Sequence, residues 1–457
     1  MSDKDLANLP PYTTTDFKAL ASKDEAFNTI LQQSNGRLNF QDPTTILILA
    51  QALLKTDFNL SLSIPDDRLC PPIPNRYNYV SWIHHLIDST SPSYSNAYDP
   101  TRTITGLDIG TGASAIYTML LLRTRPAWTM CATDIDSKSF SSAVLNLTLN
   151  NLVTRTKMLQ TIPSNPLIPL QHLDHHSTLD FTICNPPFFT SAAEMSSSLA
   201  GSKKALPPSS ICTGAEVEMV CPGGDLGFAT RILHESLTLR QKVRWYTTLL
   251  GKLDSAKQLI TLLKQHDINN WAVCAIDAGG KTKRWVVGWS FGDLRPAVDV
   301  ARVWGVPHEL LPFPSEVKVK FGVQLENGGD GGENDHVMDS DDGGKVEDIS
   351  SLLNTLLAPL DLLSWSWNHD SLSGVGEASG NVWNRAYRHK KKKETEAKQV
   401  SDAGDVGMVG NEPNVALAFR VSVLPATQEV VVEWLRGRDQ VLWESFCGMV
   451  VRRVKKG

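Results

Sequence analysis

The sequence predicts an α/β fold, in which helices cover both faces of a parallel sheet. Three observations lead to this prediction. From Thr105 onward, short apolar runs typical of buried strands alternate with segments of helical periodicity. The first run breaks into the glycine turn LDIGTGAS (residues 107–114), and the second ends at the acid Asp134. The fourth ends at Asn185 and two prolines. Polar groups thus follow the carboxyl ends of several strands, where sheets of this class bind ligands.

The elements follow in order along the chain. Residues 14–60 carry apolar positions at helical spacing and predict an N-terminal helical region. Residues 63–79 are rich in proline and predict a connector, which leads into a short helix over residues 80–88. The strands and helices of the sheet are expected at 105–110, 113–123, 128–136, 137–151, 156–162, 178–184, 227–240, 243–251, 254–266, 271–277 and 284–291.

The last third of the chain changes in composition. Residues 326–344 are acidic, rich in glycine and nearly free of large apolar side chains, which predicts disorder. An amphipathic helix is expected within residues 346–367, and two strands and a helix within 415–454. We therefore expect four regions: an N-terminal helical extension (1–75), a central α/β domain (76–300), an acidic linker (301–345) and a small α+β accessory domain (346–457) with a disordered insertion near 370–412.

Composition excludes several classes of protein. The chain has 457 residues, 41% hydrophobic and 20% charged, which is ordinary for a globular protein. Its net charge of −5 means that any nucleic-acid-binding surface has to be local. The longest apolar run, residues 44–54, is too short to span a bilayer, and the first ten residues lack the apolar core of a signal peptide. Seven scattered cysteines without a CxxC pair argue against a disulfide framework or a zinc site, and we expect no metal.

The glycine turn and the following acid predict a nucleotide-like ligand. Asp108, Gly110 and Gly112 end the first strand, and a tight glycine turn lets the backbone approach a ligand at the start of a helix. Asp134 ends the second strand, where a carboxylate can accept hydrogen bonds from two ribose hydroxyls. Residues 110–115 also satisfy a loose G-x-G-x-x-A pattern, so the turn alone does not show whether the cofactor is NAD or S-adenosylmethionine. Nor does it exclude a turn that is only structural.

The turn at Asn185, Pro186, Pro187 and Phe188 separates the two cofactors. The lone pair of a conjugated amine, such as the 6-amino group of adenine, is delocalised, so the nitrogen must pyramidalise before it attacks a methyl sulfonium. An asparagine oxygen and the carbonyl of the next residue can accept the two N–H hydrogens. Prolines stiffen such a turn in advance, and an aromatic ring can stack on the base. The purely structural alternative is a proline turn that caps a strand, with Phe188 in the core.

With these motifs, the sequence resembles class I S-adenosylmethionine-dependent methyltransferases that act on planar nitrogen and have a Rossmann-like fold. LDIGTGAS, ATDID and ICNPPFF carry this resemblance. The flanking segments RYNYVSWIHHLI, PPSSICTGAEVEMV, GGDLGFATRILHESL, RWYTTLLGK and TKRWVVGWSF resemble a narrower family, the U6 small nuclear RNA adenine-N(6) methyltransferases. This methyltransferase-like 16 family is related to the bacterial 23S ribosomal RNA adenine methyltransferase F. The resemblance covers roughly residues 14–292, in order.

The resemblance implies N(6)-methylation of one adenosine in a structured RNA such as a U6 hairpin, in an ACAGAGA-like context. It implies S-adenosylmethionine as cofactor and a nuclear, or also cytoplasmic, location. It also implies that residues 76–300 are the catalytic domain and that the N-terminal extension and the C-terminal accessory domain bind RNA. The family's cofactor contacts fall on Arg76, Gly110, Ser114, Asp134 and Asn185. Another contact falls near Asn165, in a loop where the family has lysine and threonine and this sequence reads IPSNP. The acid after the second strand is a glutamate in many relatives and an aspartate here. Read from the residues alone, Arg76 serves equally as a contact to the cofactor carboxylate or to RNA, or as a surface arginine.

Basic residues beside these motifs are candidates for RNA phosphates, or else belong to solvated faces. They are Lys203, Lys204, Arg244, Lys252, Lys283 and Arg284. Three rival functions stay open. A glutamine-amide methyltransferase shares the NPPF turn, an RNA-binding factor without turnover has no need of it, and a dehydrogenase needs a hydride-handling residue that we do not find. The oligomeric state is left open.

Overall fold

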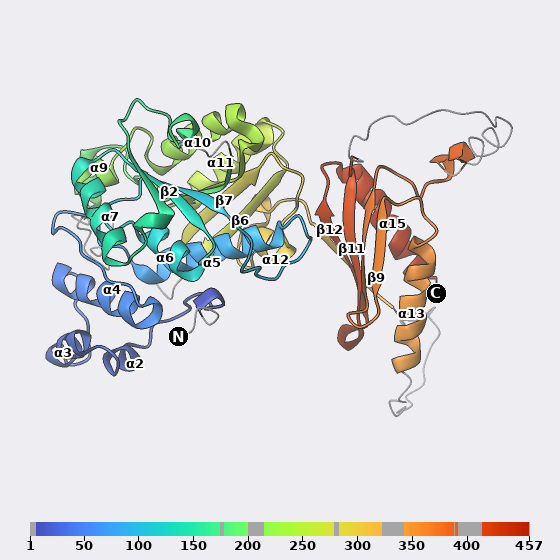
Figure 1. Ribbon diagram of the computed structural model, residues 1–457, viewed down its shortest axis with the longest axis horizontal. Coiled ribbons are helices and arrows are strands. Elements are labelled where there is room, and N and C mark those ends of the chain that lie inside the picture. Colours follow the sequence, from blue (N-terminus) through green and yellow to red (C-terminus); the bar gives the residue numbers. More distant parts are fainter. Residues whose placement is uncertain are drawn as a thin grey trace, which may run out of the picture. The chain divides into compact units, whose positions relative to one another are not determined.

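The computed structural model describes residues 6–173, 178–199, 214–277, 283–321, 342–387, 389–391 and 414–456. It divides into two compact units (Figure 1). The first consists of residues 1–91, 95–292 and 299–312, and the second of residues 92–94, 293–298 and 313–457. The chain therefore passes between the units several times.

A seven-stranded sheet forms the centre of the first unit, in the order β3-β2-β1-β4-β5-β7-β6. Strands β1 to β5 pair in parallel, whereas β7 is antiparallel to both β5 and β6. The apolar run of β7 reads the same in either direction, so its orientation is not visible in the sequence. The strands are β1 (Thr105–Ile109), β2 (Thr129–Asp134), β3 (Thr156–Gln160), β4 (Leu179–Cys184), β5 (Val243–Leu250), β6 (Asn270–Ile276) and β7 (Arg284–Ser290).

Helices cover both faces of this sheet, as expected for an α/β fold. Helices α5 and α6 lie against one face and α10 and α11 against the other (Figure 1). The proline-rich connector is shorter than the sequence suggests, because α5 begins at Ile73; Pro74 is tolerated in its first turn, where no intrahelical amide bond is needed. The helices are α5 (Ile73–Ser89), α6 (Ile116–Thr124), α7 (Ser137–Leu149), α8 (Ala192–Leu199), α9 (Glu216–Met219), α10 (Gly224–Leu239), α11 (Leu253–Gln265) and α12 (Val298–Ala301).

The N-terminal region is helical, as predicted, with α2 (Phe17–Ala21), α3 (Glu25–Gln33) and α4 (Pro43–Phe58). Aspartate side chains cap all three helices; that of Asp42 accepts the Thr45 amide of α4 at 2.9 Å. The chain that follows α4 is fixed to α7 by two asparagines: Asn150 bonds the backbone of Ser61, and Asn146 that of Ser63, each through an N–H and a carbonyl at 2.8 Å. This region is thereby joined to the layer beside the glycine turn.

The second unit is an antiparallel five-stranded sheet in the order β8-β12-β11-β10-β9, packed against α13 and α15. Its α+β class is as predicted, but three of its strands are not. Residues 316–320, within the expected linker, form β8, and residues 373–378, within the expected insertion, form β10. Residues 364–368 form β9 at the end of the expected helix, which stops at Leu357 instead. The elements are β8 (Glu316–Lys320), α13 (Asp342–Leu357), β9 (Ser364–Asn368), β10 (Ser373–Ala378), β11 (Leu417–Leu424), β12 (Glu429–Arg436) and α15 (Gln440–Val454).

Two glycines explain why β10 is hidden in the sequence. A Cβ at Gly374 would lie 2.3 Å from the Trp365 ring, and one at Gly376 would lie 2.5 Å from the Phe419 ring. The aromatic rings of neighbouring strands fill the space that a side chain would take. A strand whose neighbours supply its packing lacks the apolar alternation on which a sequence prediction depends. No helix among the described residues is long and apolar enough to cross a membrane.

Candidate active site

The glycine turn after β1 has the geometry that its residues predict. Gly110 and Gly112 have φ of +69° and +65°, in the left-handed region that favours glycine. The Thr111 amide donates to the Thr133 carbonyl at 2.8 Å, which holds the turn against the end of β2. Among the described residues, a Cβ at Gly110 would meet nothing within 4 Å. The turn is therefore open on the side where a ligand would approach the backbone.

Asp108 supports the turn from below. Its side chain is fully buried, and its Oδ2 accepts the Thr111 hydroxyl at 2.7 Å and the Thr118 hydroxyl at 3.0 Å. Its Oδ1 has no hydrogen-bond partner in the described part of the chain. Burial raises the pKa of Asp108 to about 6, although the two hydroxyl groups act in the opposite direction.

This burial predicts a pH-dependent stability. Folded Asp108 keeps its proton up to about pH 6, whereas the unfolded chain releases it near pH 4. The stabilising contribution is therefore complete below pH 4 and is lost as pH rises through 6. We expect the unfolding free energy of the wild type, relative to Asp108→Asn, to fall by about 3 kcal/mol between pH 4 and pH 7. Denaturant unfolding at several pH values measures this, with the exposed Asp254→Asn as the control variant. Parallel curves for wild type and Asp108→Asn would contradict it.

Asp134 lies beside the glycine turn, as the sequence predicts. Its Oδ2 accepts the Gly112 amide at 2.8 Å and its Oδ1 accepts the Asp136 amide at 2.9 Å. Burial raises the pKa of Asp134, and the two amides oppose this shift. Each carboxylate oxygen can accept a second hydrogen bond. The geometry thus leaves acceptor capacity for hydroxyl groups of a ligand.

Arg76 comes to this region from α5. Its side chain is buried, its Nη1 donates to the Tyr117 hydroxyl at 3.3 Å, and its guanidinium carbon lies 5.6 Å from the centre of the Tyr117 ring. Burial raises the pKa of Tyr117, Arg76 lowers it, and nearby Asp108 raises it. Arg76 is therefore an interior residue next to the glycine turn, which rules out the surface alternative.

The NPPF turn follows β4, next to β1 in the sheet. The Oδ1 of Asn185 is buried and has no hydrogen-bond partner among the described residues. The sequence predicts an open acceptor here, because an enclosed and unsatisfied one costs about 1–3 kcal/mol. This prediction is wrong, since the Asn185 Oδ1 is enclosed in the structure. The turn is held in place behind Asn185: the Phe189 amide donates to the Met219 carbonyl at 2.9 Å, and the Cys221 amide to the Phe189 carbonyl at 3.0 Å.

Phe188 rests on a glycine. A Cβ at Gly251, directly after β5, would lie 2.8 Å from the Phe188 ring. Buried Asp225 holds that glycine, since its Oδ2 accepts the Gly251 amide at 2.7 Å and its Oδ1 accepts the Ser255 hydroxyl at 2.9 Å. The Arg284 guanidinium carbon lies 5.5 Å from the centre of the Phe188 ring. The Phe188 ring, which is expected to stack on a base, is thus held between Gly251 and the Arg284 guanidinium.

The basic candidates for RNA contacts separate into two groups. Arg284 begins β7 opposite the end of β5, and Lys252 lies two residues after that end. Both therefore lie at the edge of the sheet that carries the NPPF turn, and Lys283 adjoins Arg284. Arg244 lies at the start of β5 and pairs with Asp180, at the start of β4, at 3.3 Å. Parallel strands begin at the opposite edge from the site, so Arg244 is not brought to it. Lys203 and Lys204 lie outside the described residues.

Two other predicted contacts have distinct settings. Ser114 is buried in the glycine turn. Asn165 turns its side chain into its own loop, where its Oδ1 accepts the Ile162 amide at 3.0 Å. The Asn165 side chain is therefore used within the loop, in a stretch where IPSNP stands in place of the family's lysine and threonine. The sequence reasoning also missed Tyr117, Glu218, Asp225 and Gly251; the only signal for the last three was their place inside segments quoted for the family resemblance.

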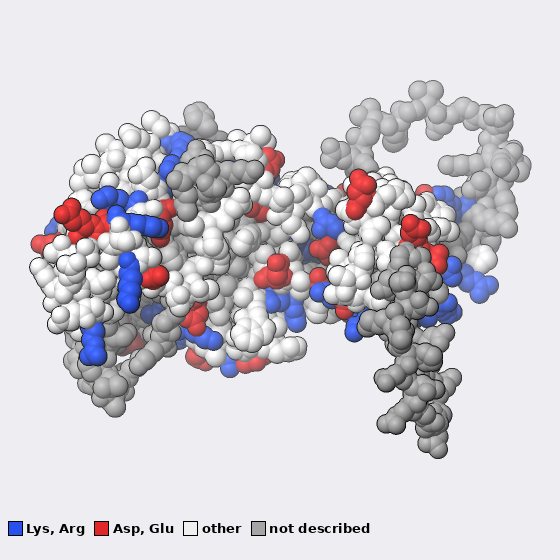
Figure 2. All heavy atoms as spheres, turned by 90° about the horizontal axis from the view of Figure 1, so that it is seen from below, with Lys and Arg blue, Asp and Glu red and all other residues white. Residues whose placement is uncertain are grey.

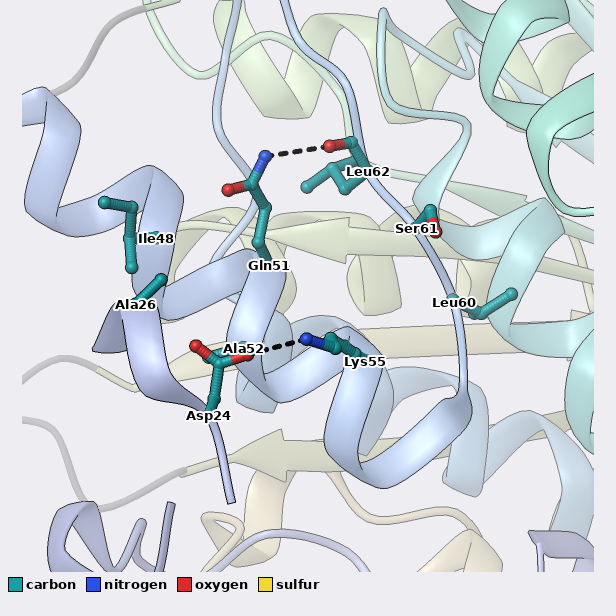
Figure 3. A pocket seen from close by; sticks show the side chains of 9 residues that line it. All are labelled: Asp24, Ala26, Ile48, Gln51, Ala52, Lys55, Leu60, Ser61 and Leu62. Carbon is teal, nitrogen blue, oxygen red and sulfur yellow. Dashed lines mark hydrogen bonds and ion pairs between the residues drawn. The ribbon is translucent and has the colours of Figure 1, made fainter. Parts of the chain in front are cut away.

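The predicted site residues do not line the pocket among the N-terminal helices. On the face shown in Figure 2, acidic and basic side chains are interspersed. A pocket of about 310 Å³ lies among the N-terminal helices, lined by Asp24, Lys55, Gln51 and Leu62 among others (Figure 3). Its polar groups pair with one another, Lys55 with Asp24 at 3.3 Å and Gln51 with the Leu62 carbonyl at 2.9 Å. Within the described residues, no group of His, Cys, Asp or Glu side chains is placed to hold a metal ion.

Comparison with known proteins identifies the family. A family model described as RNA methyltransferase matches residues 11–293. This chain belongs to that RNA methyltransferase family. A relative from the same family in Schizosaccharomyces pombe, the U6 small nuclear RNA (adenine-(43)-N(6))-methyltransferase, is 30% identical over 92% of this chain and 96% of its own length. The human RNA N(6)-adenosine-methyltransferase METTL16 is 37% identical over 61% of this chain and 49% of its own length. The chain thus spans about half of the human relative.

Solved structures of the family agree with the fold. The human catalytic domain in complex with the MAT2A 3′UTR hairpin 1 is 37% identical, with a TM-score of 0.52, over 61% of this chain and 91% of that one. The complex with hairpin 6 has a TM-score of 0.51 at 36% identity. These findings confirm the predicted family and the Rossmann-like methyltransferase fold.

Proposed function

We propose that this protein transfers a methyl group from S-adenosylmethionine to N(6) of an adenosine in a structured RNA, and that U6 small nuclear RNA is its substrate. The observation that carries the proposal is the Asn185 Oδ1, an acceptor without a partner among the described residues, at the carboxyl end of β4. It lies one strand away from the open glycine turn. A methyl-donor site and an amine-orienting site are thereby adjacent.

The residues around the turn fit the cofactor. Gly110, Gly112 and Ser114 would form the backbone cradle of the cofactor, Asp134 would accept hydrogen bonds from its ribose, and Arg76 would offer a buried cation to its carboxylate. Asp108 fixes the cradle through Thr111. When bound, S-adenosylmethionine supplies an electrophilic methyl group on a positively charged sulfur.

The NPPF turn orients the amine of the target base. Asn185 accepts one N(6) hydrogen and the Pro186 carbonyl accepts the other, so the nitrogen lone pair is freed from the ring. As the new N–C bond forms, the C–S bond breaks, and N(6) then loses a proton to solvent. Asparagine is no base, so its task is geometric. Phe188 stacks on the base, which has to leave its own stack to reach the site.

U6 small nuclear RNA is proposed because of how the relatives align. The match to the fission yeast U6 methyltransferase runs through both units, across 421 residues. We infer a nuclear location from the same relationship. The second unit is proposed as an additional RNA-binding region, since most of it lies beyond residue 293, where the match to the family model ends. The N-terminal helices, which lie inside that match, are proposed as another.

The test is methyl transfer from labelled S-adenosylmethionine to a U6-like hairpin, compared with the same hairpin carrying guanine at the target position. We expect label only on the adenine-bearing RNA, recovered as N(6)-methyladenosine. Hairpin binding without label would indicate an RNA-binding factor without turnover. Label on a glutamine-containing peptide instead of RNA would indicate the amide methyltransferase.

Arg284 gives a second test of the RNA-binding edge. It is half-buried beside Phe188, whereas Arg244 is paired at the opposite edge of the sheet. We expect Arg284→Ala to weaken hairpin binding about tenfold and to lower the slope of log K against log salt by about one, because one phosphate contact is lost. Arg244→Ala is the matched comparison and should leave the slope unchanged. Titrations at several salt concentrations measure both; equal slopes for Arg284→Ala and wild type would remove Arg284 from the interface.

A further inference from the structure

The start of α10 packs against the backbone that carries Phe188. This helix begins within GGDLG, a part of the sequence that resembles the family but belongs to neither the glycine turn nor the NPPF turn. A Cβ at Gly224 would lie 3.0 Å from the Phe188 carbonyl oxygen, and one at Gly227 would lie 2.3 Å from the Pro222 carbonyl oxygen. Only residues without a side chain let these backbones approach so closely. The first turn of α10 is therefore fixed relative to the NPPF turn.

Asp225 lies in that first turn and joins three elements. Its side chain is buried. Its Oδ1 accepts the Leu226 amide of α10 at 2.8 Å and the Ser255 hydroxyl of α11 at 2.9 Å. Its Oδ2 accepts the amide of Gly251, directly after β5, at 2.7 Å. One oxygen thus ties the two helices together, and the other fixes the glycine against which the Phe188 ring rests.

Asp225 also acts on the second neighbour of the ring, Arg284. The Arg284 guanidinium carbon lies 5.5 Å from the centre of the Phe188 ring. Burial lowers the pKa of Arg284 and nearby Arg76 lowers it further, whereas Asp225 raises it. The Asp225 carboxylate therefore stabilises the cation beside the ring. The contacts of the ring with Gly251 and with Arg284 thus both depend on this one buried acid.

Resting on the function proposed above, we propose that Asp225 is a positioning residue for methyl transfer, which fixes the Phe188 ring and thereby the place where the target adenine stacks. Asp225 is buried behind Gly251, so its effect reaches the base through the ring. A ring that is held in advance places N(6) against the Asn185 acceptor without a further ordering step. A ring that is free to shift lets the base bind in positions from which N(6) cannot attack.

Replacing Asp225 with asparagine isolates this task. The amide has nearly the same shape and keeps one oxygen for the Leu226 amide, but its NH2 group cannot accept the Gly251 amide. We expect Asp225→Asn to lower kcat for the hairpin about 10- to 100-fold, because a small displacement at a positioning residue costs that much. The KM for the hairpin should change less than about threefold, since the other contacts with the RNA remain.

The deciding experiment is a double-mutant cycle in the full chain, with methyl transfer from labelled S-adenosylmethionine to the U6-like hairpin as the readout. In the Phe188→Ala background, Asp225→Asn should lower kcat further by less than about twofold, because the ring that it positions is already absent. A purely structural role would cost the same factor in both backgrounds. Asp254→Asn, which replaces an exposed aspartate in the first turn of α11, should change neither rate.

If thermal unfolding shows that Asp225→Asn does not fold, Ser255→Ala carries the same test. It removes one group that holds the carboxylate, and its loss of about threefold should likewise vanish in the Phe188→Ala background. Equal losses in the two backgrounds would overturn the proposal, and so would a normal rate for Asp225→Asn. A wild type that puts no label on the hairpin would instead contradict the proposed function.

Discussion

Replacing Asn185 with alanine is expected to lower the single-turnover rate of methyl transfer about 10²- to 10³-fold while the affinities for the hairpin and the cofactor stay within a few-fold. The buried Oδ1, which has no partner among the described residues, is the acceptor that we propose orients the amine, and loss of one preorganised polar group at a reacting centre costs that much. The effect falls on the rate because the interaction develops as the amine pyramidalises. Quench assays with saturating RNA and cofactor, together with direct titrations, distinguish rate from binding.

The matched control is Asn39→Ala, an exposed asparagine whose side chain caps a local turn through the Gln41 amide at 3.0 Å. It should retain wild-type turnover. If Asn185→Ala also kept its full rate, the amine would have to be oriented by another group, and the assignment of the NPPF turn would fail.

Replacing Gly251 with alanine is expected to lower kcat/KM for the hairpin about 100-fold. The new Cβ would lie 2.8 Å from the Phe188 ring and 3.4 Å from an Asp225 oxygen, so the ring must be displaced from its present position. A displacement of about 1 Å at a positioning residue is enough for a loss of this size. Steady-state kinetics with varied RNA, supported by thermal unfolding, measure it.

Gly380→Ala is the control, because a Cβ there would meet nothing within 4 Å among the described residues. It should change neither kinetics nor stability by more than twofold or a few tenths of a kcal/mol. A Gly251→Ala protein that folds and methylates normally would mean that Phe188 does not stack on the base in the position described.

The sequence revealed the catalytic core well because its signals are local. Each of its three motifs can be recognised from a few consecutive residues: the glycine turn, the acid at the end of a strand and the asparagine before two prolines. The second unit was predicted less completely. Its β10 contains Gly374 and Gly376, whose packing comes from Trp365 and Phe419, and such a strand has no periodicity of its own.

The supporting residues of the site could not be predicted from the sequence, because they act through tertiary contacts. Asp225 reaches Gly251 across 26 residues, and Glu218 reaches Leu69 across 149. Arg244 illustrates the reverse. It is basic and begins the family segment RWYTTLLGK, but it lies at the edge of the sheet opposite the site, because β5 runs parallel to β4. Direction within a sheet decides which neighbours in sequence become neighbours in space.

The passage of the chain between the two units has a consequence for its synthesis. The first unit needs residues 299–312, since the indoles of Trp82 and Trp271 donate to the carbonyls of Val300 and Leu310, each at 3.0 Å. By then the ribosome has already released residues 293–298, whose Arg295 amide pairs with Leu435 near the end of the chain. The nascent protein must therefore carry this segment without its partner strand until Leu435, 140 residues after Arg295, has been translated. Cleavage between the units would not yield two complete folding units.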